Sequence, residues 1–268
     1  MRRGASYRRP LSGVDRPPFR NPSTILPLNF LAVGYHPHDA SQCSANELDF
    51  LTDLAQKPRI KAWGEIGLDY NRMYSPREDQ EKWFVRQLQI AAQLQLPLIF
   101  HERDTRGRFL EILKADFKNE SGGVVHCFSG TVSELQEYLD LGVYIGVTGI
   151  VTLRARGSDL REMVPHIPAN RLVVETDAPY LTPAPEKYHT RRNEPAFVKF
   201  VLLKLAEIRI EADMDNREVW EECNAMTFNP WQSLAAHRPV GGINRTRKPI
   251  YAEVGEFRRR ENRLRNSQ

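Results

Sequence analysis

The chain has 268 residues, of which 41% are hydrophobic, and this is enough for one large α/β barrel domain. It contains no run of about 18 apolar residues, which excludes a transmembrane helix, so we expect no membrane partner. The three cysteines form no C-x-x-C pair. This pattern excludes a disulfide framework and favours a reducing, cytoplasmic location.

The net charge of +4 is distributed unevenly. Residues 1–30 carry six arginines and one aspartate, a net of +5, and residues 236–268 carry nine Lys or Arg and three Glu, a net of +6. Residues 31–235 therefore carry −7. Because neither end shows a sustained apolar period, we expect both ends to be disordered and residues 31–235 to form the folded domain. A basic tail can add salt-sensitive affinity for nucleic acid, but a solvated tail is the more common case.

From residue 31 onward, short apolar runs alternate with patterns typical of amphipathic helices. We expect helices near Ala45–Gln56, from about Pro76, around Phe109–Leu113 and Leu135–Leu139, and over Phe197–Ile208. We expect strands at Phe30–Val33, Ile60–Trp63, Pro97–Phe100, Val124–Val125, Val143–Gly146 and Leu172–Glu175. This alternation predicts a parallel sheet joined by right-handed crossovers.

Four of the apolar runs are followed by a residue that can bind metal: Glu65, His101, His126 and Asp177. The carboxyl ends of parallel strands open into one mouth, so these distant positions can converge there. Alone, each would more often be a surface acid or a structural histidine, but four in succession favour a metal site. Two imidazoles and two carboxylates suit zinc, manganese or magnesium. Asp177 could also accept a proton from an attacking water, and Glu175 could be a partner of the ligands.

Four further residues are candidates for binding substrate: His36, His38, Arg103 and Arg192. The H-x-H spacing of the two histidines would suit chelation of one ion on an extended segment, whereas a rigid turn at Pro37 would aim only one imidazole inward. The two arginines follow predicted strand ends, and a guanidinium can bind phosphate through two hydrogen bonds. Surface arginines are common, so each of them alone is weak support.

Six motifs follow one another along the chain: Gly34-Tyr35-His36-Pro37-His38, Gly64-Glu65-Ile66-Gly67-Leu68-Asp69, His101-Glu102-Arg103-Asp104, Val125-His126-Cys127-Phe128-Ser129-Gly130, Glu175-Thr176-Asp177-Ala178-Pro179-Tyr180 and Arg192-Asn193-Glu194-Pro195. In this order they resemble the TatD family of metal-dependent deoxyribonucleases, which are amidohydrolase-like barrels. The resemblance covers about residues 31–235. It implies a TIM-type (β/α)8 barrel, a divalent metal, and 3′–5′ exonucleolytic cleavage of DNA. It also implies that Glu65, His101, His126 and Asp177 are the metal ligands, and we expect Asp177 and Glu65 to be the catalytic residues.

The chain departs from the family pattern at its amino end. Family members begin with two βα units before the G-x-H-P-H motif, and the 30 or so residues found here do not read as those elements. We therefore expect an incomplete barrel that holds six of the eight strands. Many members also carry an H-x-H on the first strand, and His36-Pro37-His38 lies too far along the chain to replace it.

The resulting expectation is a hydrolase that cleaves phosphodiester bonds of DNA with a metal-activated water. Mg²⁺ is the first candidate for the cofactor, with Mn²⁺ and Zn²⁺ as alternatives. We expect a monomer whose partner is DNA, with single-stranded DNA and RNA as further candidates. Because a fold does not fix a substrate, hydrolysis of another ester or of an amide bond is one alternative. An inactive, truncated scaffold is the other.

Overall fold

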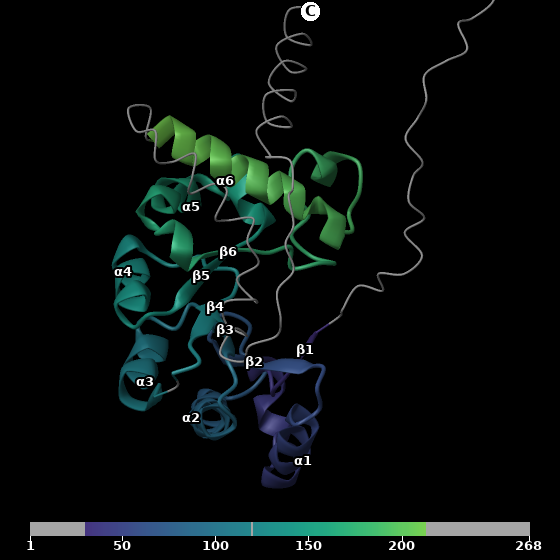
Figure 1. The fold of residues 1–268 in the computed structure, drawn as a ribbon, viewed down its shortest axis with the longest axis vertical. Helices are drawn as coiled ribbons and strands as arrows, with labels where there is room; N and C mark the ends of the chain where they lie inside the picture. Colours follow the sequence, from purple (N-terminus) through teal and green to yellow (C-terminus); the bar gives the residue numbers. More distant parts are fainter. Residues whose placement is uncertain (1–29, 119, 213–268) are drawn as a thin grey trace, which may run out of the picture. The chain divides into compact units, whose positions relative to one another are not determined.

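One parallel sheet organises the part of the chain that the structure describes. The structure is a computed structural model that describes residues 30–118 and 120–212. The segments expected to be disordered, 1–30 and 236–268, lie outside the described residues except for Phe30. Within them, six strands pair in parallel in the order of the sequence (Figure 1). These are β1 (Leu31–Val33), β2 (Ile60–Asp69), β3 (Leu98–Arg103), β4 (Gly123–Val125), β5 (Tyr144–Val147) and β6 (Leu172–Val174).

The order of the strands is that of a β/α barrel, in which successive crossovers continue in one direction. A doubly wound sheet reverses its order at a switch point, and the six described strands show no such reversal. All six strands are parallel, so their carboxyl ends lie at the same edge of the sheet. The predicted α/β class and the six predicted strands are confirmed.

Helices connect most of the strands. They are α1 (Ala45–Ala55), α2 (Arg77–Leu94), α3 (Arg108–Asp116), α4 (Val132–Asp140), α5 (Ser158–Met163) and α6 (Val198–Ala212). Short 3₁₀ turns occur at η1 (Pro37–Gln42), η2 (Gly149–Thr152), η3 (Val164–His166), η4 (Ala169–Arg171), η5 (Glu186–Tyr188) and η6 (Pro195–Phe197). Helix α5 was not predicted, because its six residues are too few to show an apolar period. In the described part of the chain, no helix has the length and apolarity needed to cross a bilayer.

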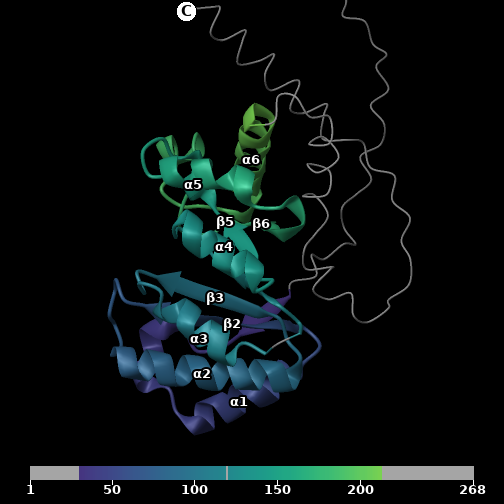
Figure 2. The same cartoon turned by 90° about the vertical axis from the view of Figure 1, so that its left-hand side faces the viewer.

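Helices α2 and α3 lie beside β3 (Figure 2). An aromatic cluster holds the strand against both helices. Phe84 of α2 stacks on Phe109 of α3 with ring centroids 4.9 Å apart, and both rings meet Phe100 of β3 edge to face. All three side chains are buried, as are Leu88 and Ala91 on the same face of α2. The cluster fixes the strand that carries His101.

Strand β2 is longer than the sequence indicated, since it continues through Glu65 to Asp69. The prediction that this strand ends at Gly64-Glu65 is wrong, because the glycines there serve close packing instead of a loop. Gly67 pairs with His101 at a φ of +145°, and a Cβ on it would lie 1.9 Å from the carbonyl oxygen of His101. Likewise β3 continues to Arg103, so His101 lies inside its strand.

We predict that Gly67→Ala destabilises the fold far more than Gly107→Ala. Both glycines have positive φ, but a Cβ on Gly107 meets nothing within 4 Å. The control Gly107→Ala therefore loses only the free energy of backbone strain, about 1 kcal/mol. Gly67→Ala adds a steric clash, so we expect its free energy of unfolding to fall by about 3 kcal/mol or more. Urea denaturation measures both changes. Equal losses for the two variants would show that β2 and β3 do not need this close approach.

Candidate metal centre

The four residues predicted to bind metal lie together at the carboxyl side of the sheet. Glu65 is in β2, His101 is in β3, His126 directly follows β4, and Asp177 follows β6. Oε1 of Glu65 lies 3.0 Å from Nδ1 of His101 and 4.0 Å from Nε2 of His126. The same Nε2 lies 3.3 Å from Oδ1 of Asp177. The four side chains thus form one contact network, with Glu65 between the two histidines.

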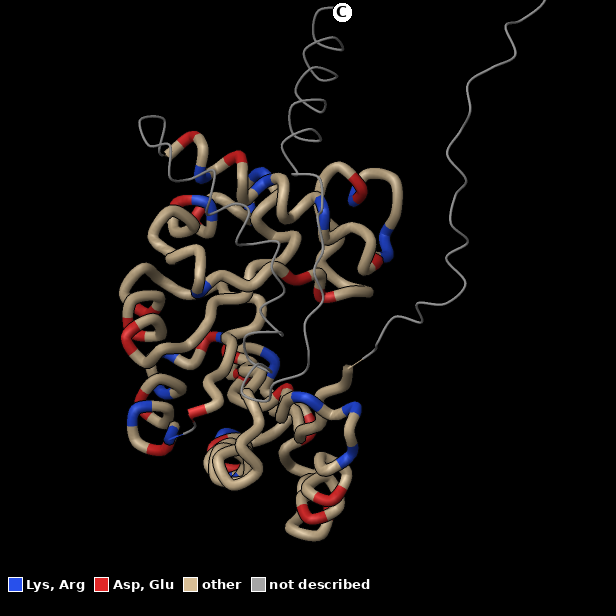
Figure 3. The backbone as a smooth tube through the Cα atoms, viewed as in Figure 1, with Lys and Arg blue, Asp and Glu red and all other residues tan. Residues whose placement is uncertain are grey.

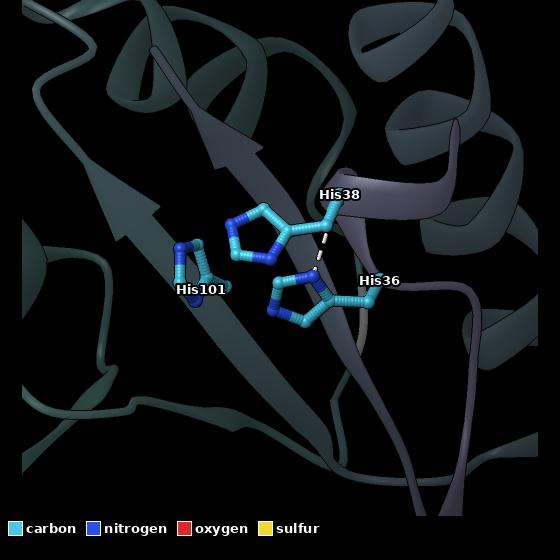
Figure 4. Close-up of side chains that lie close together, drawn as sticks. All are labelled: His36, His38 and His101. Atoms are coloured by element: carbon cyan, nitrogen blue, oxygen red, sulfur yellow. Dashed lines mark hydrogen bonds between the residues drawn. The ribbon is translucent and has the colours of Figure 1, made fainter. Parts of the chain in front are cut away.

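Two of the residues predicted to bind substrate join this network from the segment after β1. Nε2 of His36 lies 3.9 Å from Oε2 of Glu65, and Nε2 of His38 lies 2.7 Å from Oδ2 of Asp69. Both imidazoles face His101 (Figure 4), and one nitrogen from each of the three rings can be chosen within 4.8 Å of the others. The alternative in which Pro37 aims only one imidazole inward is therefore not what the structure shows.

A hydrogen bond sets the tautomer of His36. The backbone N–H of His38 donates to Nδ1 of His36 at 3.1 Å. A neutral ring with an accepting Nδ1 carries its proton on Nε2, the nitrogen that faces Glu65. In this state His36 offers an N–H to the site, which suits a hydrogen-bond donor to a substrate anion.

Two carboxylates hold the histidines in place, and one of them was missed from the sequence. Asp69, which is 1% exposed, accepts from Nε2 of His38 and contacts Nε2 of His101 at 3.1 Å. Glu175 contacts Nδ1 of His126 and accepts from the backbone N–H of Cys127, as expected of a partner of the ligands. A carboxylate on the outer ring nitrogen fixes the orientation of a ligating histidine. The signal for Asp69 was its place in the same motif as Glu65.

The network shifts the pKa values of its members. Burial alone would raise the pKa of Glu65, but the hydrogen bond with His101 and the charges of His126 and His101 outweigh it and lower that pKa to about 2. Burial alone would lower the pKa of His101, but Asp69 and Glu65 raise it to about 9. Burial and the charge of His101 lower the pKa of His36 to about 4. Protonated imidazoles therefore balance the negative charge of the carboxylates. A bound divalent cation would supply the same positive charge.

The donor atoms fit a divalent metal ion. Two ligands about 2.1 Å from one ion lie roughly 3.0–3.4 Å apart in octahedral or tetrahedral geometry. The Glu65–His101 pair at 3.0 Å and the His126–Asp177 pair at 3.3 Å match this spacing, whereas the Glu65–His126 pair, at 4.0 Å, is wider. The eight side chains of the network supply only imidazole nitrogen and carboxylate oxygen, which suits zinc, manganese or magnesium. They are His36, His38, Glu65, Asp69, His101, His126, Glu175 and Asp177.

The two arginines predicted to bind substrate stay outside the network. Arg103 is half-buried at the end of β3 and Arg192 is exposed in the loop before α6. Neither side chain has a hydrogen bond or an ion pair with another described residue. Beside Arg192, the buried Asn193 donates from Nδ2 to the carbonyl oxygens of Thr176 and Tyr180 at 2.7 and 2.6 Å. Asn193 thus clamps the loop that carries Asp177, a role the sequence did not indicate.

A sequential parallel sheet with imidazoles and carboxylates at its carboxyl edge defines a metal-dependent hydrolase of the barrel class. Comparison with known proteins identifies the family. The model of the family described as TatD related DNase matches residues 24–229, so the chain belongs to that family. The predicted family, the TIM-barrel hydrolase fold and the enzyme class, a hydrolase acting on DNA, are confirmed. The family is metal-dependent, and the cluster of His36, His38 and His101 could hold a metal ion.

The chain is similar to curated exonucleases over most of its length. It is 47% identical over 181 residues to the 3′-5′ ssDNA/RNA exonuclease TatD of Citrobacter koseri, a match that covers 67% of this chain and 70% of the relative. It is 46% identical to the protein of the same name from Escherichia coli K12, with the same coverage.

Solved structures of TatD homologues share the fold. YJJV, a TatD homologue from Escherichia coli K12, superposes with a TM-score of 0.65 at 27% identity and covers 78% of this chain and 77% of its own. A TatD family hydrolase from Entamoeba histolytica gives 0.63 at 29% identity, with 76% and 73% covered.

We predict that Glu175→Gln lowers the affinity for Mn²⁺ by about 10- to 100-fold, because a neutral amide holds His126 less firmly than a carboxylate does. Glu78→Gln, at an exposed position in the first turn of α2, is the matched control and should leave the affinity unchanged. Isothermal titration calorimetry of both variants measures the change. An affinity of Glu175→Gln equal to that of the control would show that Glu175 does not support a metal ligand.

Proposed function

We propose that the chain is a metal-dependent 3′–5′ exonuclease that hydrolyses phosphodiester bonds of single-stranded DNA. RNA is a further candidate substrate, because the TatD relatives are named as ssDNA/RNA exonucleases. One observation carries the proposal. Glu65 contacts both His101 and His126, and His126 also contacts Asp177. The predicted cytoplasmic location and monomeric state remain predictions.

Four residues would hold the metal in this proposal: Glu65, His101, His126 and Asp177. Mg²⁺ is the first candidate, and Mn²⁺ and Zn²⁺ offer the same donor chemistry. A bound divalent ion supplies a Lewis acid for the phosphoryl oxygen and lowers the pKa of a bound water. Asp69 and Glu175 would keep the imidazoles of His101 and His126 oriented through the contacts described above.

The remaining chemistry falls to the side chains around the network. Asp177 would accept the proton of the attacking water. Its side chain is 29% exposed, and Asn193 holds the loop that carries it. Glu65 is the second catalytic candidate. His36 would donate from Nε2 to a phosphate oxygen. Arg103 and Arg192 would bind phosphates farther along the strand, where a contact positions the substrate without taking part in the chemistry.

We predict that His101→Ala and Asp177→Ala each lower kcat for Mg²⁺-dependent cleavage of single-stranded DNA by about 100-fold or more, because one removes a ligand and the other removes the proton acceptor as well. His166→Ala, an exposed histidine away from the network, is the control. EDTA should abolish cleavage by the wild-type chain. A wild-type chain that cleaves another ester or an amide, but not DNA, would contradict the assigned substrate. Activity retained by both site variants would contradict the assigned residues.

A further inference from the structure

Tyr74 is an exposed aromatic ring at the rim of the metal centre. Its side chain is 63% exposed, yet its ring lies edge to face with the imidazole of His38 at a centroid distance of 4.9 Å. His38 in turn contacts Asp69 and lies 5.5 Å from His101, ring to ring. An exposed tyrosine is common, but the ring of this one contacts His38, a member of the network.

The segment that carries Tyr74 is fixed before any ligand binds. The backbone N–H groups of Asn71 and Arg72 donate to Oδ1 of Asp69 at 3.0 and 2.7 Å. On its other side, the hydroxyl of Ser75 donates to the carbonyl of His38 at 2.8 Å. A ring held on a fixed segment loses little conformational entropy on stacking, which favours binding.

The same segment combines an aromatic face with a positive charge. Nη1 of Arg72 lies 3.4 Å from the hydroxyl of Tyr74, and Met73 between them has a φ of +52°. A non-glycine residue with positive φ stores strain of about 1 kcal/mol, which is commonly found at ligand clamps. A ring for a base next to a guanidinium for a phosphate is the combination that single-stranded nucleic acids require.

Lys and Arg residues are scattered among Asp and Glu along the described backbone (Figure 3). A ring at the rim can retain a strand through its bases without a continuous basic track.

We propose that Tyr74 stacks on a nucleobase next to the scissile phosphate, with Arg72 on the adjoining phosphate, an inference that rests on the proposed nuclease function. Tyr180 is the competing ring, since it is 70% exposed and its N–H donates to the carbonyl of Asp177 at 2.7 Å. Tyr74 is preferred because its ring contacts a ring of the network, whereas the ring of Tyr180 has no aromatic contact among the described residues.

The test compares two single-stranded oligonucleotides with the full 268-residue chain. One ends in two thymidines at its 3′ end, and the other carries abasic nucleotides at these two positions. For the wild-type chain we expect KM to be lower for the thymidine oligonucleotide by about 5-fold or more, with a smaller change in kcat. Tyr74→Ala should lose this difference, and Tyr74→Phe should keep it. Tyr74→Leu, which keeps the bulk without the ring, replaces Tyr74→Ala if that variant does not fold.

A binding assay without catalysis gives a second readout. An oligonucleotide with 2-aminopurine at its 3′ end, added in EDTA, should lose fluorescence when the base stacks on Tyr74. The quenching should be absent in Tyr74→Ala and present in Tyr188→Ala, a variant at another tyrosine that is 75% exposed. Tyr188 has no contact with the network.

The proposed function and the role of Tyr74 fail separately. A wild-type chain that cleaves neither oligonucleotide overturns the nuclease function, and quenching that depends on Tyr74 would still support base binding there. If the chain cleaves both oligonucleotides, and Tyr74→Ala keeps the wild-type ratio of KM values, the role of Tyr74 is overturned. The same holds if only Tyr180→Ala loses the ratio.

Discussion

Glu65 of β2 contacts the imidazoles of His101, in β3, and of His126, directly after β4. These two contacts join the carboxyl ends of the three strands. A partly buried carboxylate is costly unless it is paired, so the fold must supply positive charge at this point. Imidazolium protons supply it without a metal, and a divalent cation would supply it with one. The positions of Asp69, Glu175 and Asp177 follow, because each contacts a histidine that Glu65 also contacts.

The backbone meets this constraint through close approach and through unusual local conformations. Gly146 of β5 leaves room for Glu175, because a Cβ there would lie 1.4 Å from Oε1 of that carboxylate. Asp177 and Cys127 both have positive φ, at +55° and +50°. Residues in such conformations cost free energy that the surrounding contacts must offset. Their occurrence directly beside the network is consistent with a site whose geometry takes precedence over local stability.

Much of the fold was predictable, because each strand is an apolar run between polar segments. The sequence also indicated Glu65, His101, His126 and Asp177, since residues at the carboxyl ends of parallel strands share one mouth. The predicted end of β2 was wrong, because glycine and acidic residues in a sequence are typical of a loop. Their packing against β3 is seen only in the structure.

Other features depend on contacts between distant segments that no local pattern encodes. The inward orientation of both His36 and His38 follows from the 3₁₀ turn that begins at Pro37. Asn193 clamps the Asp177 loop across a gap in sequence of 17 residues to Thr176. Asp69 was visible as a motif residue, but its contact with two imidazoles required the register of β2 against β3.

The most direct measurement is the anomalous scattering of Mn²⁺ in crystals of the chain. If the network is one metal centre, an anomalous peak should lie within about 2.3 Å of donor atoms from Glu65, His101, His126 and Asp177. A peak bound only by His36 and His38, or no peak among these residues at saturating Mn²⁺, would contradict this account.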